Sequence, residues 1–430
     1  MSSNREHFGS RSAVIMAMAG SAIGLGNIWR FPYMTGEYGG AAFILIYIAC
    51  TLILSLPIFL SEVVIGRRTH SNAIGAMKQL APGSGWRVLG YLSVVTPMII
   101  VSYYSIVGGW SIEYFLKSFS LGFGEFTPSG WTALAFDTIF LALSCGIVAL
   151  GVKSGIEKFS KMSIPVLFLL IIIILVYSVN MPGAGAGIDY LVKPDLSKVT
   201  GKTFAFAMGQ SFYSLSLGMG IIITYSSYVN KEENVIAMGL GTAIADLMFA
   251  ILAGFAIMPA VFSAGIKPSA GPGLIFQTLP FVFTEMGAGV KWISVAVSAL
   301  FLLTVIVAAM TSSVSTIEVG VAYLVEEKKI ERKKACLLVF ILTWLLGLAC
   351  ALSIKVFGMV DAFASNFLLT IGALLVVLFV GWKMKRKDVR DEITNGGTRN
   401  TGAFPVIYFL IRFVAPLAVL MIFISNLLLR

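Results

Sequence analysis

Charged residues are scarce in this sequence, and their scarcity excludes an ordinary water-soluble fold. Only 12% of the 430 residues are charged, whereas 58% are hydrophobic, and the mean hydropathy is +0.91. Soluble domains carry about 25% charged residues. The composition therefore predicts a polytopic protein whose core lies within a lipid bilayer, with no stretch able to fold as a separate soluble domain.

Histidine and cysteine are also rare, which argues against an enzyme. The two histidines, His7 and His70, lie near the terminus and in a loop, where they cannot serve a membrane-embedded catalytic centre. The four cysteines form no Cys-x-x-Cys pair and no metal spacing, so we expect them to be small core residues. No pore-lining ring or oligomeric repeat of a channel is present either. The sequence predicts no enzymatic activity.

The net charge of +10 does not indicate a nucleic-acid partner. The basic residues stand in short loops between apolar segments, where they set the orientation of the chain in the membrane. We therefore expect the lipid bilayer, and no nucleic acid, as the chain's surroundings.

About eleven apolar segments are long enough to span a bilayer, which takes about 20 helical residues. The first run carries no cleavage site, so we expect it to be a retained helix and not a signal peptide. The segments lie near residues 11–35, 41–66, 88–118, 132–151, 158–181, 203–229, 235–265, 290–326, 335–354, 359–383 and 404–429.

The distribution of Lys and Arg predicts the orientation of these segments. With a cytoplasmic N-terminus, nearly every basic cluster, such as 67–87, 328–334 and 383–399, falls on the cytoplasmic side. An odd number of spans then places the C-terminus outside. We expect a multi-pass protein of the inner (plasma) membrane.

The first segment is interrupted by a glycine-rich stretch, Gly20-Ser-Ala-Ile-Gly-Leu-Gly-Asn-Ile-Trp-Arg-Phe-Pro32. Backbone that leaves a helix within a bilayer is tolerated only inside the protein or along a watery cavity. An amide and a guanidinium at this depth, from Asn27 and Arg30, are costly unless they meet a ligand or a partner. The glycines alone would equally suit close helix packing.

The sixth segment repeats this irregularity in Gly209-Gln-Ser-Phe-Tyr-Ser-Leu-Ser-Leu-Gly-Met-Gly220. Paired glycine-interrupted segments in corresponding positions of two halves indicate a transporter binding site near the membrane midplane. Because each half would hold five spans, an odd number, the second half would be inverted relative to the first. We expect a single transporter domain over 1–430, with repeats at 11–181 and 203–383 and an additional helix at 404–429.

Three groups of polar residues in apolar surroundings are candidates for function. Thr311 and Ser312 offer hydroxyl groups to a hard cation, although such residues also serve helix packing. Asp246 is a carboxylate within an apolar run, and an intramembrane acid is a functional candidate by default; a structural ion pair is the alternative. Arg30 with Asp361, and Arg5 with Glu326, are potential gates or ordinary surface ion pairs.

These motifs resemble those of the neurotransmitter:sodium symporters, in particular their bacterial amino-acid carriers. The resemblance rests on the interrupted first segment, on the 209–218 stretch and on Thr311-Ser312-Ser313, and it covers essentially the whole chain. It implies an all-α membrane fold with an inverted five-plus-five helix repeat, broken helices 1 and 6, and one added C-terminal helix. It also implies sodium-coupled transport by alternating access, with a monomer sufficient for transport.

The resemblance further implies the roles of individual residues. One sodium ion would be held by Ala22, Asn27, Ser214, Asp246 and the substrate carboxylate, and a second by Gly20, Ile23, Ala308, Thr311 and Ser312. The substrate would contact Ala22, Gly24, Gly26, Ile100, Tyr104, Tyr213, Ser216, Met219, Ser313 and Thr316. The outer gate would be Arg30 and Asp361, and the inner gate Arg5, Glu326 and Tyr228.

Departures from the family pattern narrow the expected substrate. Gly24 stands where monoamine carriers have Asp, so an amino acid is favoured over an amine lacking a carboxylate. The negative charge of Asp246 would remove the need for chloride. Met219 replaces a bulkier aromatic residue, which suits a pocket for large apolar or aromatic side chains. The expected function is import of neutral hydrophobic L-amino acids; a carrier of small zwitterions or osmolytes, or a non-transporting sensor, is the alternative.

Overall fold

The computed structural model describes residues 7–266, 273–286 and 290–428, and every regular element in these ranges is a helix. Nine helical stretches in the described ranges are long and apolar enough to cross a membrane. They are α3–η2–α4 (Ala41–Thr69), α6 (Arg87–Ser118), α7 (Trp131–Ala149), η3–α8 (Val152–Val179), α12 (Val235–Ser263), α14 (Lys291–Lys328), α15 (Arg332–Leu352), α16–η6–α17–η7 (Ile354–Lys383) and α19–η8–α20 (Phe404–Leu428).

Two broken segments complete the predicted set of eleven. The first consists of α1 (Arg11–Ala22) and η1–α2 (Gly26–Glu37), which meet at an angle of 60°. The sixth consists of α10 (Gly201–Ser214) and α11 (Ile221–Ser226), joined by the non-helical residues 215–220. The predicted segments are therefore found in order, with ends that differ by less than about two helical turns, and the expected all-α fold with broken helices 1 and 6 is confirmed.

Short helices fill several of the connections. They are α5 (Ala73–Leu80), α9 (Ala184–Val192), η4 (Leu196–Lys198), η5–α13 (Leu274–Met286) and α18 (Arg386–Ile393). The last of these lies in a stretch rich in charges and turn residues. Val389 and Ile393 of α18 are completely buried, so this connection is packed against the protein.

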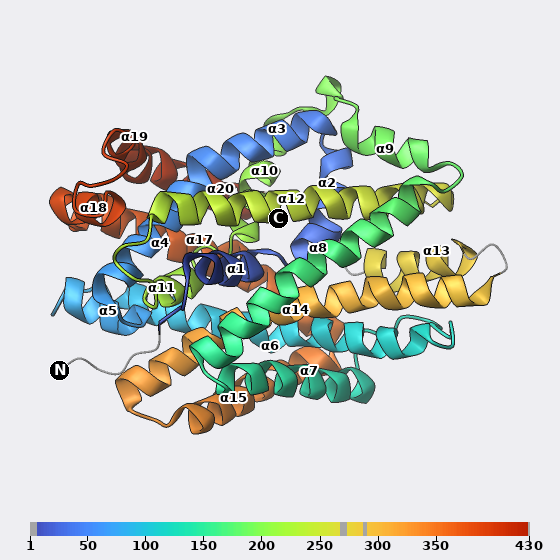
Figure 1. Cartoon of the computed structure of the whole chain (residues 1–430), viewed down its shortest axis with the longest axis horizontal. Helices are drawn as coiled ribbons and strands as arrows, with labels where there is room; N and C mark the ends of the chain where they lie inside the picture. Colours follow the sequence, from blue (N-terminus) through green and yellow to red (C-terminus); the bar gives the residue numbers. More distant parts are fainter. Residues whose placement is uncertain (1–6, 267–272, 287–289, 429–430) are drawn as a thin grey trace.

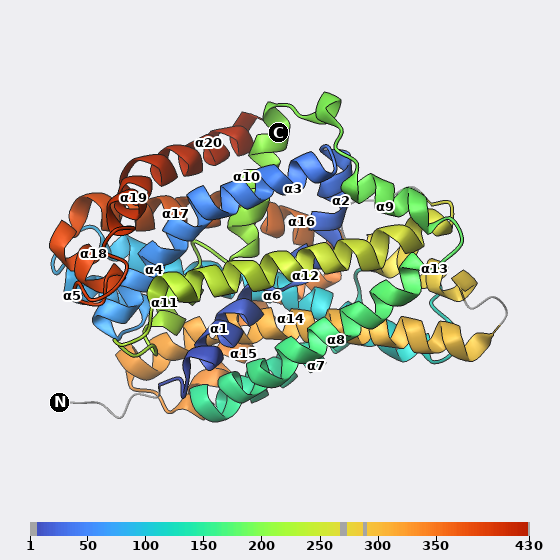
Figure 2. The same ribbon diagram turned by 45° about the horizontal axis from the view of Figure 1, so that its top comes forward.

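α1 contacts α8, α12 and α14, which lie around it in Figures 1 and 2. α6 packs along α14 on one side and α7 on the other, and α15 packs against both α6 and α7. The two broken segments also touch, through α1 with α11 and α10 with η1. The interruptions in the chain thus come together inside the bundle.

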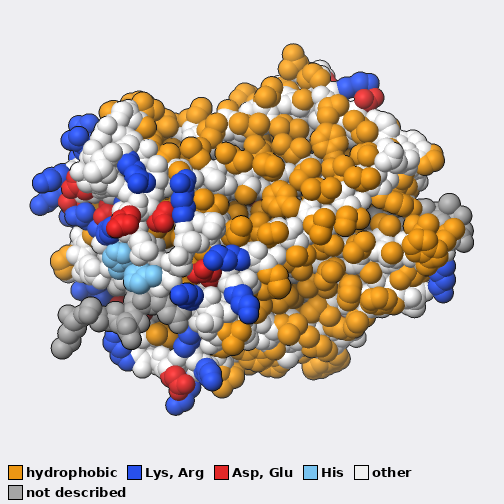
Figure 3. Space-filling model, in the orientation of Figure 1, with side chains coloured by type: hydrophobic (Ala, Val, Ile, Leu, Met, Phe, Trp, Pro, Cys, Tyr) orange, Lys and Arg blue, Asp and Glu red, His pale blue; other side chains and the backbone are white. Residues whose placement is uncertain are grey.

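The surface consists of a broad apolar belt and of ends where charged side chains gather. Hydrophobic side chains cover most of the face seen in Figure 3, whereas Lys, Arg, Asp and Glu gather at the end where α5 and α18 lie. Leucines at mid-helix positions, such as Leu143 and Leu169, are 50% and 59% exposed. Such exposure is unfavourable in water and favourable against lipid chains, which agrees with helices that span a bilayer.

Backbone geometry explains why the sixth segment breaks where it does. Gly218 and Gly220 have φ values of 80° and 71°, in the left-handed region that only glycine adopts without strain. A Cβ atom on Gly218 would lie 2.2 Å from the carbonyl oxygen of Leu369. The helix therefore ends at a point where the chain must pass close to α17.

Candidate functional site

The two breaks are joined by a hydrogen bond and enclose a small cavity. The Ser216 hydroxyl donates to the carbonyl oxygen of Ser21 over 2.7 Å, although Ser216 itself has a positive φ of 54°. Backbone strain of this kind persists only where the surroundings impose it, and it is common at functional sites. The adjacent cavity has a volume of about 50 Å³.

All but one of the residues predicted to contact the substrate line this cavity. Ser313 is the exception: it is buried in α14 but is not part of the lining, whereas the neighbouring Ser312 is. The lining residues are Ser21, Ala22, Gly24, Leu25, Gly26, Asn27, Ile100, Tyr104, Tyr213, Ser214, Ser216, Met219, Ser312 and Thr316. No side chain in this set is charged.

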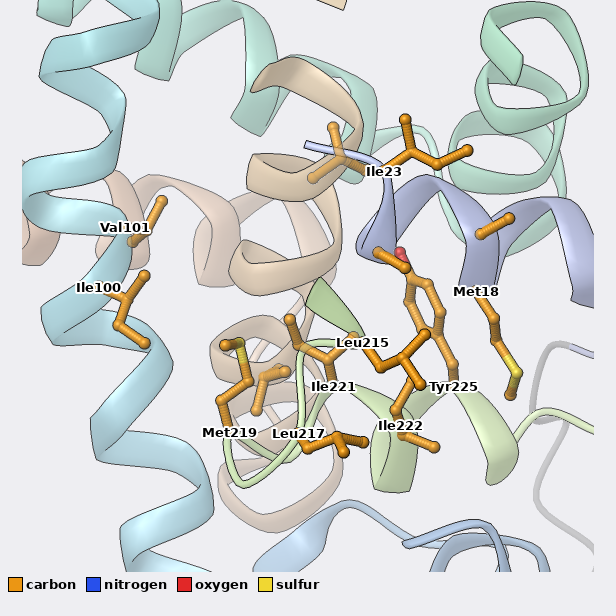
Figure 4. Close-up of a cluster of buried hydrophobic side chains, with 14 of the residues drawn as sticks. Met18, Ile23, Ile100, Val101, Leu215, Leu217, Met219, Ile221, Ile222 and Tyr225 are labelled. Atoms are coloured by element: carbon orange, nitrogen blue, oxygen red, sulfur yellow. The ribbon is translucent and has the colours of Figure 1, made fainter. Parts of the chain in front are cut away.

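One wall of the cavity is apolar. Ile100 on α6 faces Met219 on the non-helical 215–220 stretch, and Figure 4 shows the two side chains across the gap between these elements. Both residues are more than nine-tenths buried. An unbranched methionine adapts its shape to what it contacts, so this wall can accommodate apolar groups of different sizes.

A buried polar cluster lies beside the cavity, centred on Asp246 of α12. The Asn27 amide donates to Asp246 Oδ1 over 2.7 Å. The Ser214 hydroxyl lies 2.8 and 2.9 Å from the two carboxylate oxygens, and the Tyr47 hydroxyl donates to Oδ2 over 3.2 Å. Asn27 also accepts, through Oδ1, from the Gly24 amide over 3.0 Å. Three of the predicted ligands of the first sodium ion, Asn27, Ser214 and Asp246, thus form one hydrogen-bonded network whose side chains carry oxygen atoms, which hard cations prefer.

A second cluster of oxygen atoms lies where α1 ends against α14. The Thr311 hydroxyl is 2.9 Å from the Ala308 carbonyl oxygen and 3.5 Å from that of Ile23. The Ser312 hydroxyl is 3.4 Å from each of the same two carbonyl oxygens. Gly20 lies beside this cluster, since a Cβ on Gly20 would lie 3.5 Å from Thr311 Cβ. The structure therefore brings the predicted oxygen ligands from Ile23, Ala308, Thr311 and Ser312 together.

Two tyrosines separate this region from a larger cavity. Tyr104 and Tyr213 line both the small cavity and a second one of about 430 Å³. Arg30 and Asp361, predicted as the outer gate, also line the larger cavity. No ion pair joins these two described residues: Arg30 lies over the Tyr213 ring, 5.3 Å from its centroid, and Asp361 accepts from the Ser365 hydroxyl over 3.0 Å.

Aromatic side chains pack together on the side of the binding region that faces away from the larger cavity. Phe8 is buried and packs edge to face on Tyr225 and Tyr228. The Tyr228 hydroxyl donates to Glu318 over 2.8 Å, and Glu318 forms an ion pair with Arg332 of α15. This side of the bundle is therefore tightly packed.

The predicted inner ion pair is only partly described. Glu326 accepts from the backbone and side-chain nitrogens of Asn72 over 2.7 and 2.9 Å. Its predicted partner, Arg5, lies outside the described residues. The pairing of Arg5 with Glu326 therefore stays a prediction.

Sequence reasoning missed three residues that the structure places at these clusters. Tyr47 donates to Asp246, Glu318 pairs with Arg332, and Glu62 of α4 accepts from the Gly218 amide over 2.7 Å. Glu62 and Glu318 are acids within apolar runs, the same signal that identified Asp246. Tyr47 carried no such signal, because tyrosine is common in membrane helices.

The sequence was compared with protein-family models and with known proteins, and both comparisons found sodium-dependent transporters. The model of the sodium:neurotransmitter symporter family matches residues 5–127 and 126–429. An uncharacterised sodium-dependent transporter of Bacillus subtilis, YhdH, is 36% identical over 97% of this chain and 96% of its own length. An uncharacterised sodium-dependent transporter of Haemophilus influenzae is 35% identical over 98% of each chain.

A solved structure resembles the whole chain. The crystal structure of MhsT in complex with L-phenylalanine superimposes with a TM-score of 0.87 and 36% sequence identity, and the match covers 98% of this chain and all of that one. The family model, the two relatives and the solved structure thus each match nearly the full length of this chain. The chain belongs to the sodium:neurotransmitter symporter family.

Proposed function

We propose that this sodium-dependent symporter imports neutral hydrophobic or aromatic L-amino acids. The observation that carries the proposal is the small cavity between the two helix breaks, which has an apolar wall of Ile100 and Met219 and no charged lining residue. Gly24 offers no acid to an amine that lacks a carboxylate. The structural likeness to MhsT, crystallised with L-phenylalanine, supports the same class of substrate.

Two sodium ions would be bound by the two oxygen clusters. In the first cluster Asp246, Asn27 and Ser214 would be joined by the substrate carboxylate as a further ligand, so that ion and substrate stabilise each other's binding. The second would be held by the carbonyl groups of α1 and α14 with the Thr311 and Ser312 hydroxyls. Half-helix ends at the breaks add partial charges suited to a carboxylate and a cation.

The arrangement of cavities supports alternating access. The larger cavity reaches Tyr104 and Tyr213 from the side of Arg30 and Asp361, whereas Phe8 and Tyr228 pack against each other on the opposite side. We assign this conformation to a state that receives substrate from outside. Tyr104 and Tyr213 would close over the substrate, and the Arg30–Asp361 pair would form when the outer side closes.

The remaining assignments complete the proposal. Because Asp246 supplies a fixed negative charge, transport would not need chloride. The transporter would work as a monomer in the inner (plasma) membrane, with its N-terminus in the cytoplasm and its C-terminus outside. The two inverted repeats would cover 11–181 and 203–383, followed by helix 404–429.

A second substrate class has one observation in its favour. The cavity volume is only about 50 Å³, which favours an amino acid with a short side chain. Transport of small zwitterionic amino acids is therefore the second candidate.

Uptake into proteoliposomes tests both candidates. Radiolabelled phenylalanine, leucine, alanine and glycine are offered with an inward sodium gradient, and then with potassium in place of sodium. Sodium-dependent accumulation of phenylalanine and leucine is the expected result, and accumulation of glycine or alanine alone would favour the second candidate. Binding without accumulation would identify a sensor, and uptake indifferent to sodium would contradict the coupling scheme.

A further inference from the structure

An acid that the sodium and substrate sites do not use is buried in α7. Asp137 is only 1% exposed, and neither of its carboxylate oxygens has a hydrogen-bond partner among the described residues. α7 packs against α6 and α15. A Cβ on Gly109 of α6 would lie 2.5 Å from the Asp137 backbone nitrogen, so the two helices are in close contact at this point.

The groups that face Asp137 are all neutral. Ser105 of α6 and the Cys350 thiol of α15 interact with it, and the Ser105 hydroxyl faces the carboxyl group without reaching hydrogen-bond geometry. The hydroxyl oxygen of the next residue, Thr138, accepts a hydrogen bond from the indole N–H of Trp344 over 2.9 Å. Within the described part of the chain, α14, which also packs on α7, brings no charged side chain to Asp137.

An ionised carboxylate is unfavourable in such surroundings. Burial of a charge without a partner costs several kcal/mol or more, and the group is normally neutralised instead. A cation is one means of neutralisation, but two neutral side chains provide too few oxygen ligands for sodium. A proton needs no such ligands.

The acid is connected to the wall of the binding cavity through α6. Ser105, which faces Asp137, follows Tyr104 in α6, and Tyr104 lines the cavity between the helix breaks. The Tyr104 hydroxyl lies 3.3 Å from the position that a Cβ on Gly24 would occupy. A change in the charge of Asp137 that disturbs the contact of α6 with α7 would therefore displace a residue of the cavity.

We propose that Asp137 is a proton-binding site, whose carboxyl group must carry its proton for the substrate cavity to form. When the group ionises, the proton passes to water and the carboxylate remains buried without a counter-charge. α6 and α7 then separate or admit water, and substrate binding weakens. The effect on substrate binding rests on the proposed function, whereas proton binding itself does not.

Infrared spectroscopy of the purified protein tests proton binding directly. The C=O stretching band of a protonated carboxylic acid is expected in the wild type and is expected to lose intensity in Asp137→Asn. The matched control is Asp189→Asn, since Asp189 is 51% exposed in an ion pair with Lys193 and should not alter the band. An unchanged band in Asp137→Asn would overturn the proposal. If this variant does not fold, Asp137→Glu keeps a carboxylic acid in a changed environment and should shift the band; an unshifted band contradicts the proposal.

The pH dependence of substrate binding tests the consequence. Above the pH at which Asp137 ionises, the apparent Kd of the wild type should rise by up to about tenfold per pH unit, because the competent fraction falls in that proportion. Asp137→Asn should remove this rise, and Asp189→Asn should retain it. The same alkaline rise in Asp137→Asn would contradict the proposal. Absence of amino-acid binding at every pH would refute the proposed function, while the infrared result would still decide on Asp137.

Discussion

At the residue scale, Asp246 is a buried acid whose hydrogen-bond donors are all neutral. Asn27, Ser214 and Tyr47 all donate hydrogen bonds to its carboxylate, and the residue itself is completely buried. Hydrogen bonds to an ionised group are about twice as strong as those between neutral groups. The three donors therefore hold the carboxylate in a fixed place beside the substrate cavity.

Replacement of Asp246 by Asn tests the role of its charge. Without the carboxylate, a sodium ion in the first oxygen cluster would lack a counter-charge, so uptake should fall in chloride-free buffer and recover when chloride is supplied. The measurement is the initial rate of uptake in chloride and in gluconate, with Asp189→Asn as the control. Equal rates for the Asn variant in the two buffers would argue against the assignment.

Glu62 should act through the backbone of the sixth segment. It accepts from the Gly218 amide, so Glu62→Leu leaves a buried N–H group unpaired, at a cost of about 1–3 kcal/mol. Glu62→Gln keeps an acceptor at the same place. We expect the Leu variant to lose thermal stability and uptake, and the Gln variant to retain most of both. Equal losses in the two variants would show that the charge matters, and not the acceptor.

At the scale of elements, side chains form hydrogen bonds with backbone groups at the two helix breaks, where the backbone hydrogen bonds of a continuous helix are missing. The Gly24 amide donates to the Asn27 side chain, the Gly218 amide to Glu62, and the Ser21 carbonyl oxygen accepts from Ser216. Unpaired backbone groups are costly within a bilayer. These three bonds therefore allow both segments to leave the helix at membrane depth.

Gly218→Ala tests whether the second break depends on glycine. Its positive φ costs about 1–2 kcal/mol for any L residue with a Cβ, and the added atom would lie 2.2 Å from the Leu369 carbonyl oxygen. We expect a lower melting temperature and little or no uptake. Gly209→Ala is the control, because its Cβ meets no atom within 4 Å; comparable losses in both variants would contradict the argument.

At the scale of the whole molecule, a charge cluster joins three distant parts of the chain at the end rich in Lys and Arg. Arg67, at the end of α4, is 1% exposed and donates to Glu392 of α18 over 2.9 Å and to the Glu233 carbonyl oxygen over 2.7 Å. Lys231 donates to Glu392 over 2.7 Å. The cluster therefore ties α18 to the connection between α11 and α12.

The charge of Glu392 should make stability depend on pH. Burial opposes its ionisation, but the Lys231 ammonium and the Arg67 guanidinium outweigh burial and hold its pKa below the ordinary value. A lowered pKa means that the ionised group stabilises the fold above the ordinary value of about 4.3. This contribution is lost as the pH falls through the lowered pKa.

Thermal unfolding in detergent checks this linkage with Glu392→Gln. At neutral pH the variant leaves Arg67 buried without its anion, so we expect a loss of about 3–5 kcal/mol; the difference from wild type should shrink in acid. Asp388→Asn is the control, because Asp388 pairs with Arg68 where the side chains are 31% and 29% exposed, and such pairs contribute about 0–1 kcal/mol. If the difference in unfolding free energy between Glu392→Gln and the wild type were the same in acid as at neutral pH, the linkage would be refuted.

Part of the site could be predicted from single residues and part could not. The glycines of the two breaks, Asp246 and the Thr311-Ser312 pair stand out, because each is unusual in an apolar helix. Tyr47 and Glu62 were missed, since their importance comes from which backbone or side chain they meet. Ser313 was predicted for the substrate, but the rotation of α14 places Ser312 at the cavity instead.

The sequence by itself determined the membrane class, the order of the eleven segments and the two interruptions. These follow from hydropathy and from the backbone freedom of glycine, which are properties of local sequence. Only the tertiary structure decided that the breaks meet, that two oxygen clusters form beside one cavity, and that the Asp137 carboxyl group has no hydrogen-bond partner among the described residues. Such contacts join residues far apart in the chain, and their distances depend on how the helices pack, which no local pattern encodes.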